Sequence, residues 1–126
     1  MSIPVPVEGL AEAMAERPYA YLLTVSDDGR PHAVAVTPVL VNGVLRATVG
    51  RRTVSNASAR PNGVSLVWPP AEAGGYSLIA DGAASASGEV VEVWPTKAVL
   101  HRPAPADAGS PEARSCGSDC VGVRLD

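Results

Sequence analysis

Apolar residues recur at helical spacing near the start of the chain, whereas most of the remaining sequence is predicted to form strands. The spacing from Val7 to Met14 predicts a short amphipathic helix over Val7 to Arg17. Pro18 ends this helix, because proline cannot continue the hydrogen-bond ladder. Tyr19 to Ser26 is rich in β-branched and aromatic residues and predicts the first strand. Residues 1–18 are therefore expected to form a helical segment ahead of a sheet.

Tight-turn sequences divide the next part of the chain into an antiparallel meander. The turn at 27–29 ends in Gly29, which is free to take positive φ, and it leads into a second strand over Arg30 to Val41. Asn42-Gly43 is the strongest short hairpin signal, and it joins that strand to a third over Val44 to Val49.

The alternation then breaks at a polar stretch, Gly50 to Arg60, where Thr53 or Ser55 could cap a short helix. Three more strands and a possible final one come after it. Pro95 is expected to mark a bulge or an edge, and residues 103–115 are expected to form a surface loop. The strands are predicted over Val64 to Trp68, Tyr76 to Ser87, Glu89 to His101 and, last and shortest, Val121 to Leu125.

Together these elements predict a mostly β protein with one domain over residues 1–126. Six main antiparallel strands with short helices fit a small closed or split β-barrel, and a barrel removes the sheet edges that invite aggregation. The chain has no Phe and only 4% aromatic residues, so its core must be built from Val, Leu, Ala and Ile.

Charge and cysteine content narrow the classes of function. A net charge of −3 argues against a nucleic-acid partner, which usually meets a strong basic excess. The N-terminus has neither a basic segment nor an apolar run of signal length, so we expect a cytoplasmic protein without a membrane partner. Cys116 and Cys120 are expected to be free thiols, and the spacing of Cys and His residues supports no metal site.

Four segments, in this order and spacing, resemble the pyridoxamine 5'-phosphate oxidase-like split β-barrel family, especially its actinobacterial flavin/deazaflavin oxidoreductases. They are YLLTVSDDGRPHAVAVTP (21–38), VGRRTVSNASARPNGVSLVWPP (49–70), GGYSLIADGAAS (74–85) and AVLHRPAP (98–105). The resemblance covers about two-thirds of the chain. It implies a homodimer with two cofactor sites at the subunit interface. It also implies flavin mononucleotide (FMN) as cofactor or, in some members, coenzyme F420, haem or another tetrapyrrole.

The stretch at 50–56 carries the candidate phosphate site. A phosphate monoester needs cations, several hydrogen-bond donors and preferably a helix N-terminus. The resemblance places this role on Gly50, Arg51, Arg52, Thr53 and Asn56. Many family members have a Lys near this position, whereas this chain has only Arg and Thr, so the cofactor's identity stays open. A solvated basic turn without a ligand is the alternative.

The resemblance places the cofactor ring against the second strand, at Val36, Thr37 and Pro38 after Val34. Aromatic faces at Trp68 and Tyr76 could stack on a planar cofactor or pack at a subunit contact. Trp94 is expected in the core or in a dimer interface. Roles for His32, His101 and Arg102 stay open, as does the identity of any catalytic residue.

Three functions fit these residues. The first is an FMN- or F420-dependent oxidoreductase acting on a small organic substrate, since a redox cofactor supplies its own reactivity. The second is a non-catalytic carrier of a flavin, F420 or a tetrapyrrole. The third is a dimeric barrel that has lost its cofactor.

Overall fold

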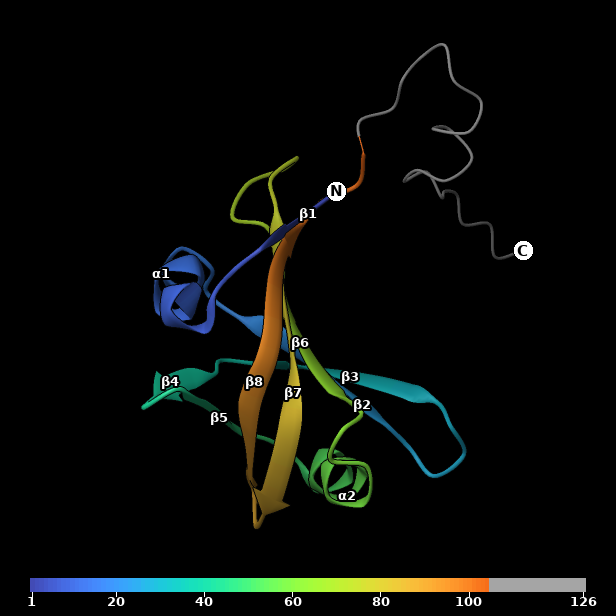
Figure 1. Ribbon diagram of the computed structural model, residues 1–126. Helices are drawn as coiled ribbons and strands as arrows, with labels where there is room; N and C mark the ends of the chain where they lie inside the picture. Colours follow the sequence, from blue (N-terminus) through green and yellow to red (C-terminus); the bar gives the residue numbers. More distant parts are fainter. Residues whose placement is uncertain (105–126) are drawn as a thin grey trace, which may run out of the picture.

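The computed structural model describes residues 1–104, and this part of the chain forms eight strands, two α-helices and one 3₁₀ turn around a curved sheet (Figure 1). The helical elements are η1 (Val7–Gly9), α1 (Leu10–Ala15) and α2 (Arg51–Ala59). The strands are β1 (Ser2–Pro4), β2 (Ala20–Val25), β3 (Pro31–Val36), β4 (Val39–Val41), β5 (Val44–Thr48), β6 (Val64–Trp68), β7 (Ser77–Ser87) and β8 (Val90–His101).

The sheet is antiparallel, and its two ends are neighbours in the sequence. Its strand order is β3-β2-β6-β7-β8-β5-β4, with β1 added beside β8. Only Thr37 and Pro38 separate β3 from β4, so the strand predicted over 30–41 is in fact two strands at opposite ends of the order. Because Pro38 has no N–H to donate, the ladder breaks there and the chain changes partner from β2 to β5. This break gives the split β-barrel that the sequence predicted.

The core lies on the inner face of this sheet and is built from aliphatic residues and one tryptophan. Burial alternates along β2 and β6, as expected for strands with one covered face. The largest fully buried side chains are Trp68, Leu10, Leu22, Leu45, Leu66, Leu78, Val91, Thr24 and Thr53. The predicted core of Val, Leu, Ala and Ile is confirmed for Val, Leu and Ala, whereas the buried residues of the part that the structure describes include Trp68 and no Ile.

The long β7–β8 hairpin carries the irregularity predicted at Pro95. Asp81 pairs with Lys97 but Gly82 pairs with Pro95, so β8 has one extra residue at this point. Gly82 is required here, since a Cβ would lie 2.4 Å from the Trp94 carbonyl oxygen. The bulge confirms the prediction at Pro95. Trp94 is 44% exposed, which excludes the core, and its expected alternative place in a dimer interface stays a prediction.

Two further expectations differ from the structure. The sequence predicted six main strands, but β1 and the β3–β4 break bring the number in residues 1–104 to eight. All three residues of β1 are exposed and carry no alternation signal, so only pairing with the end of β8 makes this segment a strand. The cap of α2 is Gly50 rather than Thr53 or Ser55, both of which lie inside the helix.

The remaining turns and the first helix match the prediction. The helix expected over 7–17 is present as η1 and α1. Asn42 (φ 50°) and Gly43 (φ 81°) form the predicted tight hairpin between β4 and β5. The expected strand at 121–125, both cysteines and nearly all of the 103–115 loop lie outside the described residues. Within the described residues, no helix has the length and apolar character needed to cross a membrane.

Candidate functional site

A pocket of about 760 Å³ lies between the β2–β3 turn and helix α2. The turn and the helix are distant in sequence but adjacent in space because α2 packs against β2 and β7. One wall is acidic and the other is basic, so the pocket combines both signs of charge. Its lining residues are Ser26, Asp27, Asp28, Arg30, Arg51, Arg52, Ser55 and Asn56.

The basic wall is the beginning of α2. Gly50 precedes the helix in an extended conformation (φ −85°, ψ 176°), and no side chain of the described residues caps the first amides. Arg51 and Arg52 are exposed and form no ion pair within residues 1–104. A Cβ at Gly50 would meet nothing within 4 Å, so the space in front of these amides is open. Free amides, the helix dipole and two guanidiniums together suit an anion such as phosphate.

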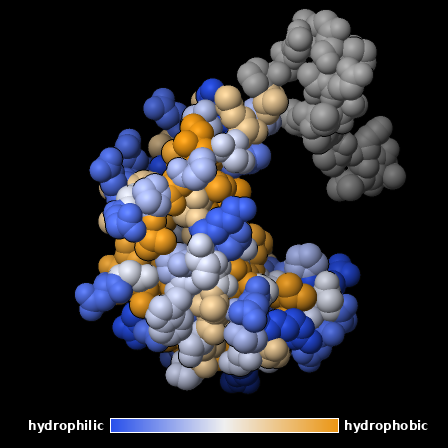
Figure 2. Space-filling model, in the orientation of Figure 1, coloured by the Kyte–Doolittle hydropathy of each residue, from blue (hydrophilic) through white to orange (hydrophobic). Residues whose placement is uncertain are grey.

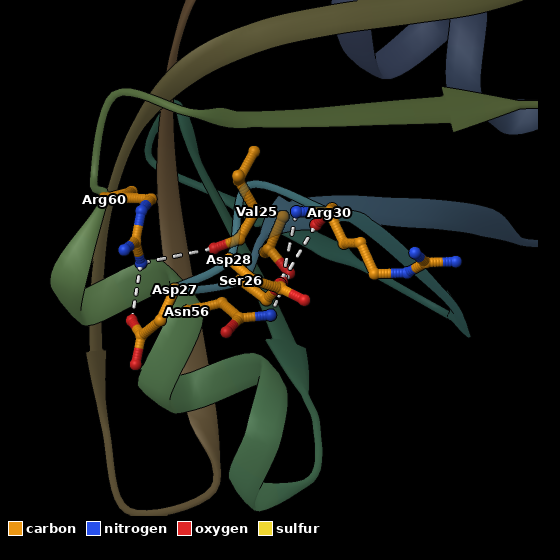
Figure 3. Close-up of polar contacts among 8 residues, drawn as sticks. Val25, Ser26, Asp27, Asp28, Arg30, Asn56 and Arg60 are labelled. Carbon is orange, nitrogen blue, oxygen red and sulfur yellow. Dashed lines mark hydrogen bonds and ion pairs between the residues drawn. The ribbon is translucent and has the colours of Figure 1, made fainter.

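The acidic wall is the turn over 26–30, in which the two carboxylates have different partners (Figure 3). Asp27 pairs with Arg60, with 3.0 Å between Oδ1 and Nη1. Asp28 instead accepts a hydrogen bond from the Ser26 hydroxyl. This hydrogen bond is the main reason that the pKa of Asp28 is lowered, and the positive charge of Arg52 lowers it further. Asp28 is therefore ionised near neutral pH and faces the arginines of α2.

A buried hydrogen bond fixes α2 against the sheet below the pocket. Asn56 Nδ2 donates to Thr24 Oγ1 at 3.1 Å, and Figure 3 shows the Asn56 side chain leaving the helix on the side of the β2–β3 turn. Thr53, predicted with the phosphate residues, is only 2% exposed and does not line this pocket. Of the residues predicted for phosphate binding, Arg51, Arg52 and Asn56 line this pocket, and Gly50 borders it at the start of the helix.

A second pocket, of about 420 Å³, lies where the barrel is split. Its lining consists of Tyr19, Ala35, Val36, Thr37 and Thr48, which come from the ends of β3 and β5 and the residue before β2. Val36 and Thr37 were predicted to face a cofactor ring, and the structure places both in this lining. Pro38, predicted with them, is buried beside it. Thr48 of this lining precedes Arg51 of the first by three residues, so their Cα atoms are at most about 11 Å apart. Tyr19 of this lining and Ser26 of the first lie at opposite ends of β2.

The aromatic residues proposed for ring stacking lie elsewhere. Trp68 is 1% exposed and belongs to the core, so the expectation of an open aromatic face at this position is wrong. Its place on the inner face follows from the alternation of β6, in which Val64 and Leu66 are buried as well. The ring of Tyr76 is occupied by Arg102, whose guanidinium lies 4.5 Å from the ring centroid.

Neither histidine lines the pocket at the predicted phosphate site. His101 Nδ1 is 3.1 Å from the Ser2 hydroxyl, where β1 pairs with the end of β8. His32 lies on β3 opposite Thr24, and its Nδ1 is buried without a hydrogen-bond partner among the described residues. No group of three or more metal-ligating side chains forms within residues 1–104.

Sequence reasoning missed the acidic wall and the far side of the second pocket. Residues 27–29 were predicted only as a turn, and the other residues of these walls, among them Tyr19 and Thr48, only as strand residues. The local sequence carries no sign that the turn folds against a helix that begins more than 20 residues later. Two adjacent Asp residues before a Gly were the one available signal, because a charged turn is expected near a cluster of arginines.

No protein-family model matches the chain. Two curated mycobacterial relatives do: "Uncharacterized protein Mb0449c" of Mycobacterium bovis and "Uncharacterized protein MT0457" of Mycobacterium tuberculosis. Each is 40% identical over 134 residues, which covers 93% of this chain and 93% of the relative.

Three solved structures share the architecture. An F420 reductase superposes with a TM-score of 0.57 at 22% identity, over 69% of this chain and 94% of its own. The FAD-binding protein of Mycobacterium smegmatis superposes with a TM-score of 0.61 at 17% identity, over 79% of this chain and 97% of its own. A Listeria innocua protein named after pyridoxamine 5'-phosphate oxidase superposes with a TM-score of 0.62 at 15% identity, over 75% of this chain and 96% of its own.

The broken β3–β4 strand, the sheet order and these superpositions define the fold as a split β-barrel, shared with these three proteins. Within this fold, the chain belongs to the family of the two mycobacterial proteins, with which it shares nearly its whole length.

Proposed function

We propose that this protein binds a phosphate-bearing flavin or deazaflavin and works as an oxidoreductase on a small organic substrate. The observation that carries the proposal is the pair of exposed arginines at the uncapped start of α2, lining a large pocket. The split-barrel pocket begins three residues earlier in the chain, at Thr48. A ligand with its phosphate at Arg51 and Arg52 and its planar ring near Thr48 would span the short stretch of chain between these residues.

The solved structures support this choice of ligand class. One neighbour is an F420 reductase and another is an FAD-binding protein. Both ligands combine a tricyclic ring with phosphate groups. The arginines of the first pocket would complement the phosphate groups of such a molecule, and the strand ends that line the second pocket would face its ring.

In this proposal, the protein binds and orients the cofactor, and the bound ring supplies the hydride or electron chemistry. Arg51, Arg52 and the first amides of α2 hold the phosphate. The backbone at Val36 and Thr37 faces the ring, and Asn56 holds the helix in position through Thr24.

We propose FMN as the cofactor, with F420 as the alternative. The anionic tail of F420 would benefit from basic residues beyond Arg51 and Arg52, and Arg60 and Arg102 are the candidates in the sequence. Arg60 is paired with Asp27, and Arg102 stacks on Tyr76. Both are engaged within the chain, which favours the shorter phosphate monoester of FMN.

We further propose that the protein is a homodimer and that a second copy covers the outer face of the sheet. Register places an apolar row across this face, because residues paired across strands point to the same side. Tyr21 pairs with Ala35 and Val67, Val67 pairs with Ile79, and Ile79 pairs with Val99. In Figure 2 hydrophobic surface runs through the middle of the molecule between more hydrophilic edges, and Tyr21 itself is 40% exposed.

Cofactor titration of the double variant Arg51→Ala/Arg52→Ala tests the proposed site. Each charge-assisted hydrogen bond is worth roughly 1.5–3 kcal/mol, so FMN affinity should fall by about tenfold or more. The fold should survive, since both side chains are exposed. Lys97→Ala, which removes an exposed cation outside the pocket, should bind FMN like the unmodified protein. Equal FMN affinity in the double variant and in Lys97→Ala would disprove the phosphate site.

Spectra of the purified protein separate turnover from storage. Flavin or deazaflavin absorbance that bleaches with a reductant and returns with an added acceptor supports the oxidoreductase. A bound cofactor that stays oxidised with every donor tested indicates a carrier. Protein that binds neither FMN nor F420 in titration is a barrel without a cofactor.

A further inference from the structure

Asp28 is placed to oppose the ligand that the pocket would otherwise attract. It lines the same pocket as Arg51 and Arg52, yet it forms no ion pair with either within the described residues. Because Asp28 and Arg52 line one pocket, their opposite charges act on each other across it. A ligand phosphate bound by Arg52 would therefore share the pocket with a fixed negative charge.

The turn that carries Asp28 is closed by hydrogen bonds at both of its ends. Ser26 N donates to the Arg30 carbonyl oxygen at 3.0 Å, and Gly29 N donates to the Ser26 carbonyl oxygen at 2.9 Å. The Arg30 N–H donates to Ser26 Oγ at 3.2 Å, while the Ser26 hydroxyl itself donates to Asp28. Gly29 takes φ 82°, which lets the turn close without strain. These contacts hold the carboxylate at the pocket instead of leaving it free to turn away.

The net positive charge around the pocket balances the negative charge of one phosphate monoester. Arg30, Arg51 and Arg52 line it together with Asp27 and Asp28, and Arg60 pairs with Asp27 from outside. Four guanidiniums against two carboxylates leave a formal charge of +2. A phosphate monoester carries close to −2 above its second pKa of about 6. An inorganic or terminal pyrophosphate brings more negative charge to the same place and meets Asp28 without a further cation to balance it. A pyrophosphate esterified at both ends carries the same charge as the monoester.

We propose that Asp28 is a specificity-determining residue, which makes the pocket select a single phosphate monoester over an inorganic or terminal pyrophosphate. This inference rests on the proposed function, since it assigns the same pocket to the ligand's phosphate. Asp27 lacks this role because its charge is neutralised in direct contact with Arg60. Removing the charge of Asp28 should weaken this selection. The turn should keep its conformation, because its backbone hydrogen bonds remain.

The test is an NMR titration at about pH 8, where a monoester is dianionic. The probes are glycerol phosphate and inorganic pyrophosphate, and the readout is the amide shifts of residues 50–53. In Asp28→Asn, pyrophosphate affinity should rise about three- to tenfold more than glycerol phosphate affinity, the size expected for one unit charge a few ångströms away in a solvated pocket. Glu72→Gln makes the same change in total charge on the exposed β6–β7 loop, outside the pocket, and should leave both affinities unchanged.

Equal gains for the two probes in Asp28→Asn, or the same response in Glu72→Gln, would overturn the assignment of Asp28 while leaving the phosphate site intact. A wild-type protein whose amides at 50–53 do not respond to glycerol phosphate would overturn the proposed function itself, and the role of Asp28 with it. The two failures are thus distinguished by the wild-type titration alone.

Discussion

Gly82 shows how closely a single position can be fixed by its neighbours. A Cβ added there would lie 2.4 Å from the Trp94 carbonyl oxygen and 2.8 Å from a Val93 methyl carbon. We therefore expect Gly82→Ala to lower the free energy of unfolding by about 1–3 kcal/mol, the usual cost of overpacking. Gly50→Ala is the control, since a Cβ there meets nothing within 4 Å. Urea unfolding measures both, and equal stability of the two variants would contradict the crowding at the bulge.

Asp28 gives a prediction about pH. Its pKa is lowered chiefly by the Ser26 hydroxyl, so its ionised form favours the folded state. That contribution is complete above the ordinary carboxyl pKa and is lost as the pH falls through the lowered value. Ser26→Ala should therefore raise the pKa of Asp28 toward its usual value of about 3.9.

Carbon-13 NMR of the side-chain carboxyl, followed between about pH 2 and pH 6, measures the pKa of Asp28 directly. Ser65→Ala serves as the control, because it removes a hydroxyl that donates to a different carboxylate, that of Asp81. The same Asp28 titration curve in Ser26→Ala and in the unmodified protein would show that the hydroxyl has no effect.

Between elements, the contact that matters most for the site is the hydrogen bond from Asn56 on α2 to Thr24 on β2. Both residues are at least 95% buried, so losing one partner leaves the other without a substitute. Thr24→Val should cost about 1–3 kcal/mol of unfolding free energy, as is usual for an unsatisfied buried group. The Thr24→Val/Asn56→Leu variant should cost less than the sum of its two single variants, because it leaves neither group unsatisfied.

Equilibrium unfolding of this double-mutant cycle measures the coupling between α2 and β2. Thr96→Val, which removes an exposed hydroxyl on β8, should change the stability little. Strictly additive costs at positions 24 and 56 would show that the helix is held by apolar packing alone.

For the molecule as a whole, the outer apolar row predicts self-association. Tyr21→Glu places a charge in the middle of this row and should convert a dimer to a monomer, because burying an unpaired carboxylate is costly. Val41→Glu makes the same change on β4, where the side chain is 47% exposed and lies outside the row. Light scattering after size exclusion gives the mass of each variant, and a monomeric unmodified protein would contradict the proposed dimer.

Much of the architecture could be predicted from the sequence, because strands and tight turns depend on neighbouring residues. Asn42-Gly43 specifies its hairpin through positive φ at both positions, and Pro95 indicates the bulge because it cannot join a continuous ladder. The candidate phosphate residues were equally visible, since arginines after a strand and a glycine form a local pattern. The sequence did not show on which side of the helix each of them would lie, so the burial of Thr53 was not predicted.

The sequence by itself determined the order of strands and turns, the aliphatic core and the basic start of α2, all of which follow from local conformational preference and from alternation. Only the tertiary structure decided that one predicted strand divides between two ends of the sheet, that β1 pairs with β8, that Trp68 faces inward and that Asp28 faces Arg52. These features depend on which distant segments meet. Contacts between residues far apart in the chain result from burying the core as a whole, so no local pattern encodes them.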